Sequence, residues 1–124
     1  MPGQVVANKP LNYCQIKLIL ETEKDGRYFY SFEENITHIG DCFSGCTELE
    51  KIILPESLES IDDGAFSWCT ELKEMIIPNN VTYISNCAFY GCSRLTNLSI
   101  PNSVTSIGEN AFRACTELKE ITLP

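Results

Sequence analysis

The segment VTYISNCAFYGCSRLTNLSIP, at residues 81–101, is followed at residues 104–124 by VTSIGENAFRACTELKEITLP. Both segments carry the same residue types at equivalent positions, which recur every 23 residues back to the middle of the chain. The recurring columns are Phe43, Phe66, Phe89 and Phe112; Cys46, Cys69, Cys92 and Cys115; Leu49, Leu72, Leu95 and Leu118; and Pro55, Pro78, Pro101 and Pro124. Repetition at one fixed period is the signature of a solenoid, in which each repeat forms one coil.

Each repeat predicts two short extended pieces joined by a turn. The pattern L-x-x-I-x-[LI]-P is typical of a strand whose Ile and final Leu or Ile point inward, while the residue between them faces solvent. Proline then ends the strand, because it has no N–H to give to the ladder. The following V-x-x-I predicts a second extended piece, and residues 64–69 reverse the chain through one helical turn or a 3₁₀ piece. One coil has too few apolar residues to close a core, so neighbouring coils must stack.

The repeat I-x-x-x-A-F-x-x-C-x-x-L-x-x-I-x-[IL]-P resembles that of the BspA-like family, the Treponema pallidum-type class of leucine-rich repeats. The resemblance covers residues 36–124 and implies an α/β solenoid that is mostly β, a right-handed leucine-rich-repeat coil with a parallel sheet along its concave side. It comprises about four 23-residue repeats, at residues 36–55, 56–78, 79–101 and 102–124. Members of this class are often cell-surface proteins of bacteria and parasitic protists that are described as adhesins.

The two ends of the repeat region are expected to differ. Residues 1–35 predict a capping segment, a β-hairpin of strands at 13–20 and 27–32 joined through Asp25-Gly26, a dipeptide typical of hairpin turns. The cap would cover the core face of the first coil. At the other end no cap is predicted, and an uncovered edge is expected to carry Phe112, Leu118 and Ile121. A bare strand edge is a template for pairing, so this edge is a candidate for homodimerisation.

The charge balance limits the classes of partner. The 124 residues include 9 Lys+Arg and 17 Asp+Glu, a net charge of −8. Nucleic-acid binding requires clustered Lys and Arg, so none is predicted, whereas electrostatic steering favours a basic protein partner. Neither a secretory signal nor a membrane-spanning stretch is predicted. Localisation stays unknown, with the cytoplasm as the default and the cell surface as what the family resemblance implies.

The seven cysteines form the most conspicuous polar feature. The members of the cysteine column are expected to lie one coil apart, about 5 Å, which is within reach of disulfide formation. We favour instead a column of buried thiols that pack as small hydrophobes. A zinc site needs four ligands that converge tetrahedrally, and a collinear column does not supply them. Cys14 lies outside the repeat, and nothing further is inferred for it.

No catalytic or cofactor-binding constellation is apparent. His38 is the only histidine, and it falls on a solvent-facing position without a nucleophile or an orienting partner beside it in the pattern. The acidic pairs Asp62-Asp63 and Glu33-Glu34 are interpreted as solvated rather than as calcium ligands. P-loop, dinucleotide-binding and serine-hydrolase motifs are missing. We therefore expect a protein that is not an enzyme and that needs no cofactor or metal.

The solvent-facing positions of the first strand of each coil are the candidate binding surface, because solenoids bind partners along their concave sheets. These positions are Glu50, Lys51, Ile53, Lys73, Glu74, Ile76, Thr96, Asn97, Ser99, Lys119, Glu120 and Thr122. Ile53 and Ile76 are neighbours among charged residues, which suits a small apolar contact with a polar rim. Intrinsic β-propensity is the competing explanation for both. A second exposed strip is predicted at residues 59–60, 82–83 and 105–106, with Tyr83 and Trp68 as candidate anchors.

Two functions fit these patterns. The first is a non-enzymatic protein-binding scaffold, an adhesin-like module that binds a protein or matrix partner through its concave face. The alternative is an intracellular assembly unit that associates with itself through the C-terminal coil. A net charge of −7 in residues 36–124, from 5 basic and 12 acidic residues, favours a basic partner in either case.

Overall fold

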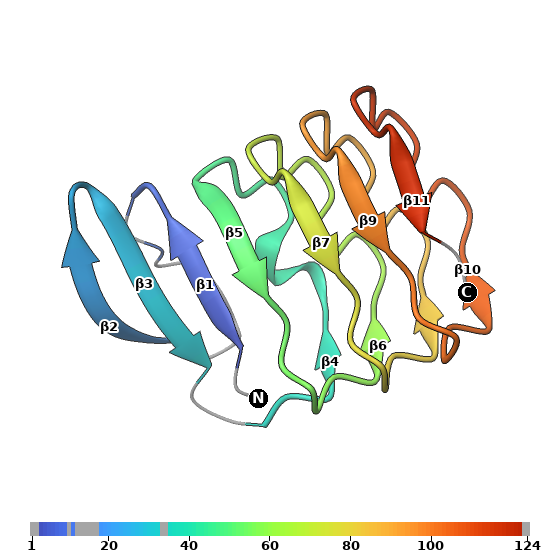
Figure 1. Ribbon diagram of the computed structural model, residues 1–124, viewed down its shortest axis with the longest axis horizontal. Helices are drawn as coiled ribbons and strands as arrows, with labels where there is room; N and C mark the ends of the chain where they lie inside the picture. The colour runs from blue at the N-terminus through green and yellow to red at the C-terminus, as the bar shows by residue number, and fades with distance from the viewer. Residues whose placement is uncertain (1–2, 10, 12–17, 33–34, 123–124) are drawn as a thin grey trace.

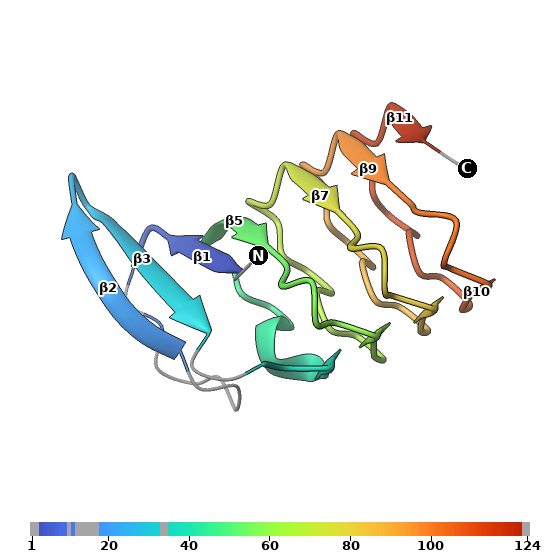
Figure 2. The same cartoon turned by 60° about the horizontal axis from the view of Figure 1, so that its bottom comes forward.

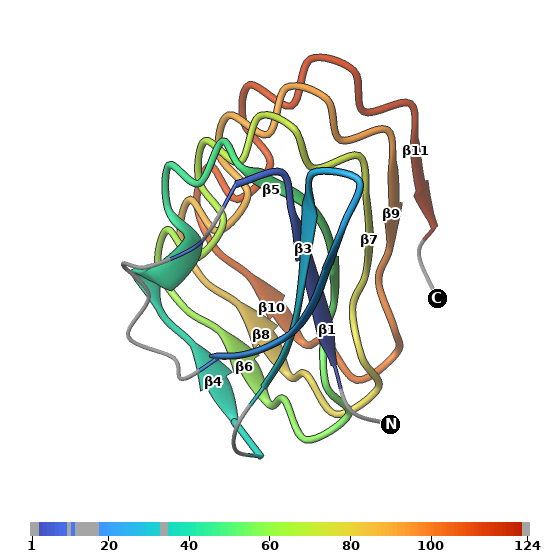
Figure 3. The same cartoon turned by 90° about the vertical axis from the view of Figure 1, so that its left-hand side faces the viewer.

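The computed structural model describes residues 3–9, 11, 18–32 and 35–122, and its coils follow one another in a row (Figure 1). One side of the row carries β5 (Leu49–Ile53), β7 (Glu74–Ile76), β9 (Asn97–Ser99) and β11 (Glu120–Thr122). Another side carries the two-residue strands β4 (His38–Ile39), β6 (Ser60–Ile61), β8 (Tyr83–Ile84) and β10 (Ser106–Ile107). Seen along the row, the strands of each set lie behind one another (Figure 3). The fold is a leucine-rich-repeat array of strands and turns.

The register between coils follows directly from the period of the sequence. In the parallel pairing of β7 with β9 and of β9 with β11, Met75 lies beside Leu98 and Leu98 beside Ile121. The two-residue strands pair in the same way, with Ile61 beside Ile84 and Ile84 beside Ile107. Each residue therefore meets its own equivalent in the next coil, because one coil takes up one repeat.

The core is a set of stacked columns inside the coils. The phenylalanine rings stack almost parallel, with centroids 5.6 Å apart for Phe43 and Phe66, 5.4 Å for Phe66 and Phe89, and 5.5 Å for Phe89 and Phe112. The leucines that follow the cysteines, Leu49, Leu72 and Leu95, are fully buried beside them. The inward and outward positions of the predicted strands are confirmed, since Ile52 and Leu54 are buried and Ile53 between them is half-buried.

Of the two alternatives expected where the chain reverses, one helical turn or a 3₁₀ piece, the described residues contain no α-helix, and the 3₁₀ piece is found in the first coil only. A single 3₁₀ turn (η1, Asp41–Phe43) occurs in the first coil. In the second coil, successive turns replace it, with N–H groups of Ala65, Ser67 and Cys69 donating to carbonyls three residues back. The backbone at Gly64 and Trp68 is left-handed, with φ of 66° and 62°. Left-handed residues at these two points interrupt any right-handed helix.

The N-terminal region is a three-stranded antiparallel cap, of which the sequence predicted two strands. β2 (Leu18–Lys24) and β3 (Arg27–Phe32) form the expected hairpin. Asp25 and Gly26 have φ of 53° and 77°, as a two-residue type I′ turn requires. The first strand was predicted at residues 13–20; it reaches Lys24, and residues 12–17 lie outside the described part. The missed element is β1 (Gln4–Ala7), which pairs antiparallel with both β3 and β5 (Figure 2).

The strand β1 changes the sheet that was expected along one side of the coils. The hydrogen-bonded order is β2-β3-β1-β5 in one sheet and β11-β9-β7 in another. The predicted parallel sheet is therefore confirmed for β7, β9 and β11, while β5 belongs to the antiparallel cap sheet. The long-strand face, which we define as the outward side of β5, β7, β9 and β11, consequently has a seam between β5 and β7.

Candidate functional site

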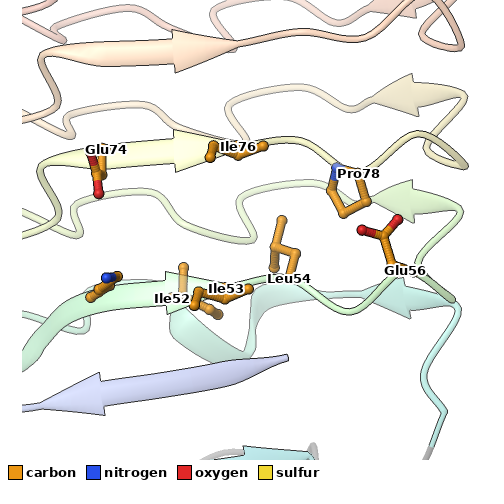
Figure 4. Close-up of a pocket in the computed structure, with 8 residues that line it drawn as sticks. Ile52, Ile53, Leu54, Glu56, Glu74, Ile76 and Pro78 are labelled. Atoms are coloured by element: carbon orange, nitrogen blue, oxygen red, sulfur yellow. The ribbon is translucent and has the colours of Figure 1, made fainter. Parts of the chain in front are cut away.

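A groove lies at the seam between β5 and β7, on the long-strand face. It has a volume of about 340 Å³ and is lined by Lys51, Ile52, Ile53, Leu54, Glu56, Glu74, Ile76 and Pro78. In Figure 4, Ile52, Ile53 and Leu54 follow one another along β5, opposite Glu74 and Ile76 of β7, and Glu56 faces Pro78 beyond the strand ends. Because the two strands pair with β1 and β9 rather than with each other, their facing edges are not drawn together by a ladder.

The apolar part of the groove includes the most exposed large hydrophobic side chain among the described residues. Ile76 is 72% exposed, and its counterpart Ile53 on β5 is half-buried. The side chains of Ile52, Leu54 and Pro78 are buried. A buried floor beneath an exposed isoleucine offers apolar area to an incoming side chain.

The rim of the groove is charged, with more acidic than basic residues. Lys51, Glu56 and Glu74 are all exposed, one cation against two anions. Within the described part of the chain, none of the three forms an ion pair. Their charges are thus available to a ligand, and their sum favours a basic one.

The structure brings together four of the twelve predicted binding residues in the groove, Lys51, Ile53, Glu74 and Ile76, whereas the exposed Lys73 is not part of its lining. Glu50 is instead bound to the cap, since Arg27 Nε donates to Glu50 Oε1 at 2.9 Å. Thr96, Asn97, Ser99 and Lys119 lie on the coils farther along the row. Glu120 and Thr122 belong to β11, and their side chains lie outside the described part.

Sequence reasoning missed four groove residues. Ile52 and Leu54 were assigned to the core and Pro78 to the end of the strand. The repeat pattern therefore gave no indication that these residues line a groove. Glu56 lies after the strand, where the pattern is polar in several coils. The groove lies where the sheet that contains the cap and β5 ends and the sheet of β7, β9 and β11 begins, a division that the repeat does not encode.

The cysteine column consists of thiols that are buried in the first three coils and half-buried at Cys115, and three of them make the same hydrogen bond. The S–H groups of Cys69, Cys92 and Cys115 donate to the carbonyls of Phe43, Phe66 and Phe89, with Sγ···O distances of 3.0, 3.0 and 3.1 Å. Each acceptor belongs to the preceding coil. The prediction of packed thiols is confirmed for these three residues, and their role as donors between coils was missed.

Burial also controls the ionisation of these thiols. It raises the pKa of Cys92 to about 12, with a further contribution from the neighbouring Cys115. Burial likewise raises the pKa of Cys69 and of Cys115. A thiol with a raised pKa is a poor nucleophile at neutral pH, so the column is structural rather than reactive. Cys42, outside the column, is disulfide-bonded, and Cys14 lies outside the described residues.

The other polar candidates form no catalytic arrangement. His38 is exposed, with Ser60 Oγ 3.4 Å from its Nδ1. Ser60 was predicted on an exposed strip but is buried. Its hydroxyl tolerates burial because it donates to Asp62 Oδ1 at 2.9 Å. Among the described residues, no three His, Cys, Asp or Glu side chains are grouped so that they could hold a metal ion. The pair Glu33-Glu34 lies outside the described part.

The predicted C-terminal edge is less buried than the rest of the core. Phe112 and Leu118 are half-buried, and Ile121 is 44% exposed. Ile107 of the same coil is 46% exposed. The residues at the equivalent positions of the two preceding coils are all buried.

A sequence profile described as the BspA type leucine rich repeat region (6 copies) matches residues 28–124. The chain belongs to the BspA-type leucine-rich repeat family. Proteins with this type of repeat are generally non-enzymatic scaffolds for protein interaction. A search of the curated proteins finds no match to the chain.

Solved structures agree with the assignment to the BspA-type family. A leucine-rich repeat protein from Bacteroides ovatus is 35% identical, with a TM-score of 0.67 over 68% of this chain and 22% of its own. The leucine-rich repeat protein of T. pallidum is 34% identical, with a TM-score of 0.66 over 71% of this chain and 46% of its own. A leucine rich cell surface protein from Faecalibacterium prausnitzii is 27% identical, with a TM-score of 0.53 over 73% and 30%. The chain thus spans less than half the length of each of these proteins.

The BspA-type repeat accounts for the columns, to which Ile52, Leu54 and Pro78 of the groove belong, but not for the other groove residues, whose positions vary between coils. Within the described residues, no helical segment has the length and hydropathy needed to cross a bilayer.

Proposed function

We propose that this BspA-type chain is a protein-binding module that recognises its partner through the groove between β5 and β7. The observation that carries the proposal is Ile76, which is 72% exposed beside a buried apolar floor. β-propensity explains an isoleucine in a strand, but the equivalent positions of the next two coils are Ser99 and Thr122, so the repeat itself does not require a large apolar residue here. A solvent-facing apolar group at a groove is typical of an interface.

The groove is suited to an aliphatic side chain that is flanked by lysine or arginine. Its volume of about 340 Å³ is at the small end of ligand sites, which suits one or two side chains. Glu56 and Glu74 on the rim would pair with the basic flanks, while Lys51 would favour one orientation of the segment over its reverse. The net charge of −8 would speed the approach of such a partner.

The wider architecture supports a module that works on a cell surface. We propose a right-handed solenoid of four coils behind an N-terminal cap at residues 1–35. Its concave side is the long-strand face. The binding surface extends beyond the groove along this face, through Lys73, Thr96, Asn97, Ser99, Lys119, Glu120 and Thr122. Parallel crossovers in one sheet are right-handed in nearly all proteins. The adhesin-like role is supported by the F. prausnitzii relative, which is described as a cell surface protein. Antibody labelling of intact and permeabilised source cells tests it: signal only after permeabilisation contradicts a surface role.

Peptide display tests the groove directly. The whole chain is used as bait for a library of random peptides, and a variant with Ile53→Asp and Ile76→Asp serves for counter-selection. We expect enriched peptides to carry an aliphatic residue next to Lys or Arg, and to lose at least tenfold in affinity for the double variant. Asn102→Asp, a substitution to the same residue at an exposed turn position outside the groove and the proposed binding surface, is the matched control and should bind as the parent does. Peptides that bind the parent and the double variant equally would remove the groove from the proposal.

Self-association through the C-terminal coil is the second candidate function. It is supported by the exposure of Ile107 and Ile121, at 46% and 44%, on the last described coil. Light scattering of the purified chain at high micromolar concentration should then give a dimer, and Ile121→Glu should convert it to a monomer with an unchanged circular dichroism spectrum. A monomeric parent chain at that concentration contradicts this candidate.

A further inference from the structure

Trp68 occupies a backbone position that does not favour a bulky residue. Its φ is 62°, and the equivalent positions of the other coils are Gly45, Gly91 and Ala114, at 71°, 76° and 63°. Left-handed backbone is accessible to glycine at no steric cost, whereas a large side chain is rare there and is strained. The side chain does not compensate by entering the core, because it is 50% exposed. Folding alone therefore gives no reason for a tryptophan at this turn.

The indole is nevertheless held in place by the next coil. Its ring and that of Tyr90 meet edge to face, with centroids 5.3 Å apart and an interplanar angle of 66°. It also lies against the backbone of Gly91, where an added Cβ would come within 2.7 Å of indole Cδ2 and 2.8 Å of Cζ3. Trp68 N–H donates to the Tyr90 carbonyl at 2.6 Å, which fixes the turn beneath the ring. The two aromatic side chains thus form an ordered aromatic shelf, a term we use for Trp68 and Tyr90 together.

Polar groups surround the shelf. Ser67, Tyr90 and Arg113 are equivalent positions of three successive coils, so the tyrosine stands between a hydroxyl and a guanidinium. Ser67 Oγ lies 3.0 Å from Ser44 Oγ of the preceding coil. Within the described part of the chain, neither indole Nε1 of Trp68 nor the hydroxyl of Tyr90 has a hydrogen-bond partner. Two open donors therefore accompany the exposed aromatic surface.

We propose that the aromatic shelf is a binding site for a neutral oligosaccharide of β-linked pyranose units. A pyranose whose hydroxyls are equatorial presents C–H groups on its faces, and these are attracted to the electron-rich face of an indole. Its hydroxyls lie at the ring edge, where the N–H of the indole and the hydroxyl of Tyr90 would bind them, with Ser67 and Arg113 at the equivalent positions of the flanking coils. The apolar surface is confined to two rings among small and polar neighbours, unlike the apolar core of a protein interface. The net charge of −8 disfavours an acidic sugar.

The shelf and the groove are separate sites. Trp68 and Tyr90 lie in the segments that connect β6 to β7 and β8 to β9, and so come before these long strands in the chain. Leu54, Glu56 and Pro78 of the groove lie beyond the opposite ends of β5 and β7. Binding at the shelf therefore does not depend on the function proposed for the groove.

Intrinsic fluorescence tests the proposal, because Trp68 is the only tryptophan of the chain. The full chain is titrated with cellohexaose, laminarihexaose and fully N-acetylated chitohexaose, and with glucose as a minimal ligand. We expect at least one hexaose to shift the emission to shorter wavelength and to reduce acrylamide quenching in a saturable manner, with glucose at least tenfold weaker. The absence of a saturable change with all three hexaoses would overturn the proposal.

Three variants then separate the shelf from other surfaces, with calorimetry as the readout for the hexaose that binds. Trp68→Gly introduces the residue found in two other coils and should lose at least tenfold in affinity while its melting temperature is kept or raised. Tyr90→Ala should weaken binding several-fold. Tyr83→Ala, which removes an exposed tyrosine on β8, is the matched control and should leave binding unchanged. Equal binding by Trp68→Gly and the parent, or loss of binding in the groove variant with Ile53→Asp and Ile76→Asp, would overturn the assignment.

Discussion

The second and third coils bury the repeat motif completely, whereas the last described coil carries the same motif and leaves part of it exposed. Phe66 and Phe89 have no exposed surface. Phe112 and Leu118, at the equivalent positions of the last coil, are half-buried. The motif A-F-x-x-C-x-x-L is identical in these coils, so the residue types do not explain the difference.

The difference shows that burial in this fold belongs to pairs of coils rather than to a single repeat. A residue in the middle of the row is covered from both sides, and one at the edge only from one side. The first coil supports this view, because the cap strand β1 covers it: Val5 of β1 and Leu49 of β5 are both fully buried. Stability should therefore depend on where in the row a substitution is made.

Removal of a phenylalanine ring should have the largest effect. Phe66→Ala takes a ring from the middle of the stack and is expected to lower the free energy of unfolding by about 3–5 kcal/mol. Phe112→Ala removes a half-buried ring with one stacking partner, and should cost less than half as much. Urea denaturation followed by circular dichroism measures both. Equal losses would contradict the comparison between middle and end coils.

The cysteine column should give a smaller and pH-dependent effect. The folded-state pKa of Cys92 is raised from 9.0 to about 12, so above pH 9 the unfolded chain loses a proton that the folded chain keeps. The contribution of this thiol to the free energy of unfolding is fully present below the pKa of the unfolded state, 9.0, and is lost as the pH rises towards the folded-state pKa of about 12. Urea denaturation between pH 7 and 11 should show this decrease.

Single substitutions locate the source of that decrease. Cys92→Ala removes the thiol and its bond to Phe66, and is expected to cost about 1–2 kcal/mol at pH 7 and to flatten the alkaline decrease. Cys115→Ala, at a half-buried position, should lower the free energy of unfolding by less at pH 7 and should flatten the alkaline decrease less. An alkaline decrease of the same slope in Cys92→Ala and the parent would show that other groups cause it.

The ion pair between coils should give the smallest effect. Arg94 and Glu71 are 3.2 Å apart on the outside of the third and second coils, with side chains 53% and 35% exposed. Solvent screening limits such a pair, so Arg94→Met, which keeps most of the aliphatic stem, should lower stability by less than about 0.5 kcal/mol. Thermal unfolding at low and high salt measures the charge component. A loss comparable with that of Cys92→Ala would show that coils are joined at their surface as strongly as in their interior.

Much of the fold could be predicted from the sequence, because the repeat period gives the length of one coil and the alternation within each repeat gives the inward and outward positions. The alternation at Ile52, Ile53 and Leu54 placed their side chains correctly, and the Asp25-Gly26 dipeptide located the hairpin turn. The strand β1 could not be predicted, since four residues with no repeat and no alternation carry little signal. Of the two alternatives for the reversal, the 3₁₀ piece is found only in the first coil, and the left-handed backbone of Trp68, which prevents a helix in the second, could not be recognised because the residue is not glycine.

The candidate sites divide in the same way. Ile53 and Ile76 were identified from their outward register, but the groove also needs Leu54, Glu56 and Pro78, which no pattern connected. Trp68 was noticed as an exposed aromatic residue, while its contact with Tyr90 depends on the stacking of two coils.

The sequence by itself determined the period, the stacked columns and the outward residues of each strand, because one repeat forms one coil and each residue meets its equivalent. Only the tertiary structure decided where that regularity is broken. β1 joins β5 to the cap sheet, β5 and β7 share no ladder, and the turn at Gly91 leaves room for the indole of Trp68. Both features arise from contacts between segments that no local preference encodes, since hydrogen-bond partners and steric room are properties of neighbours in space.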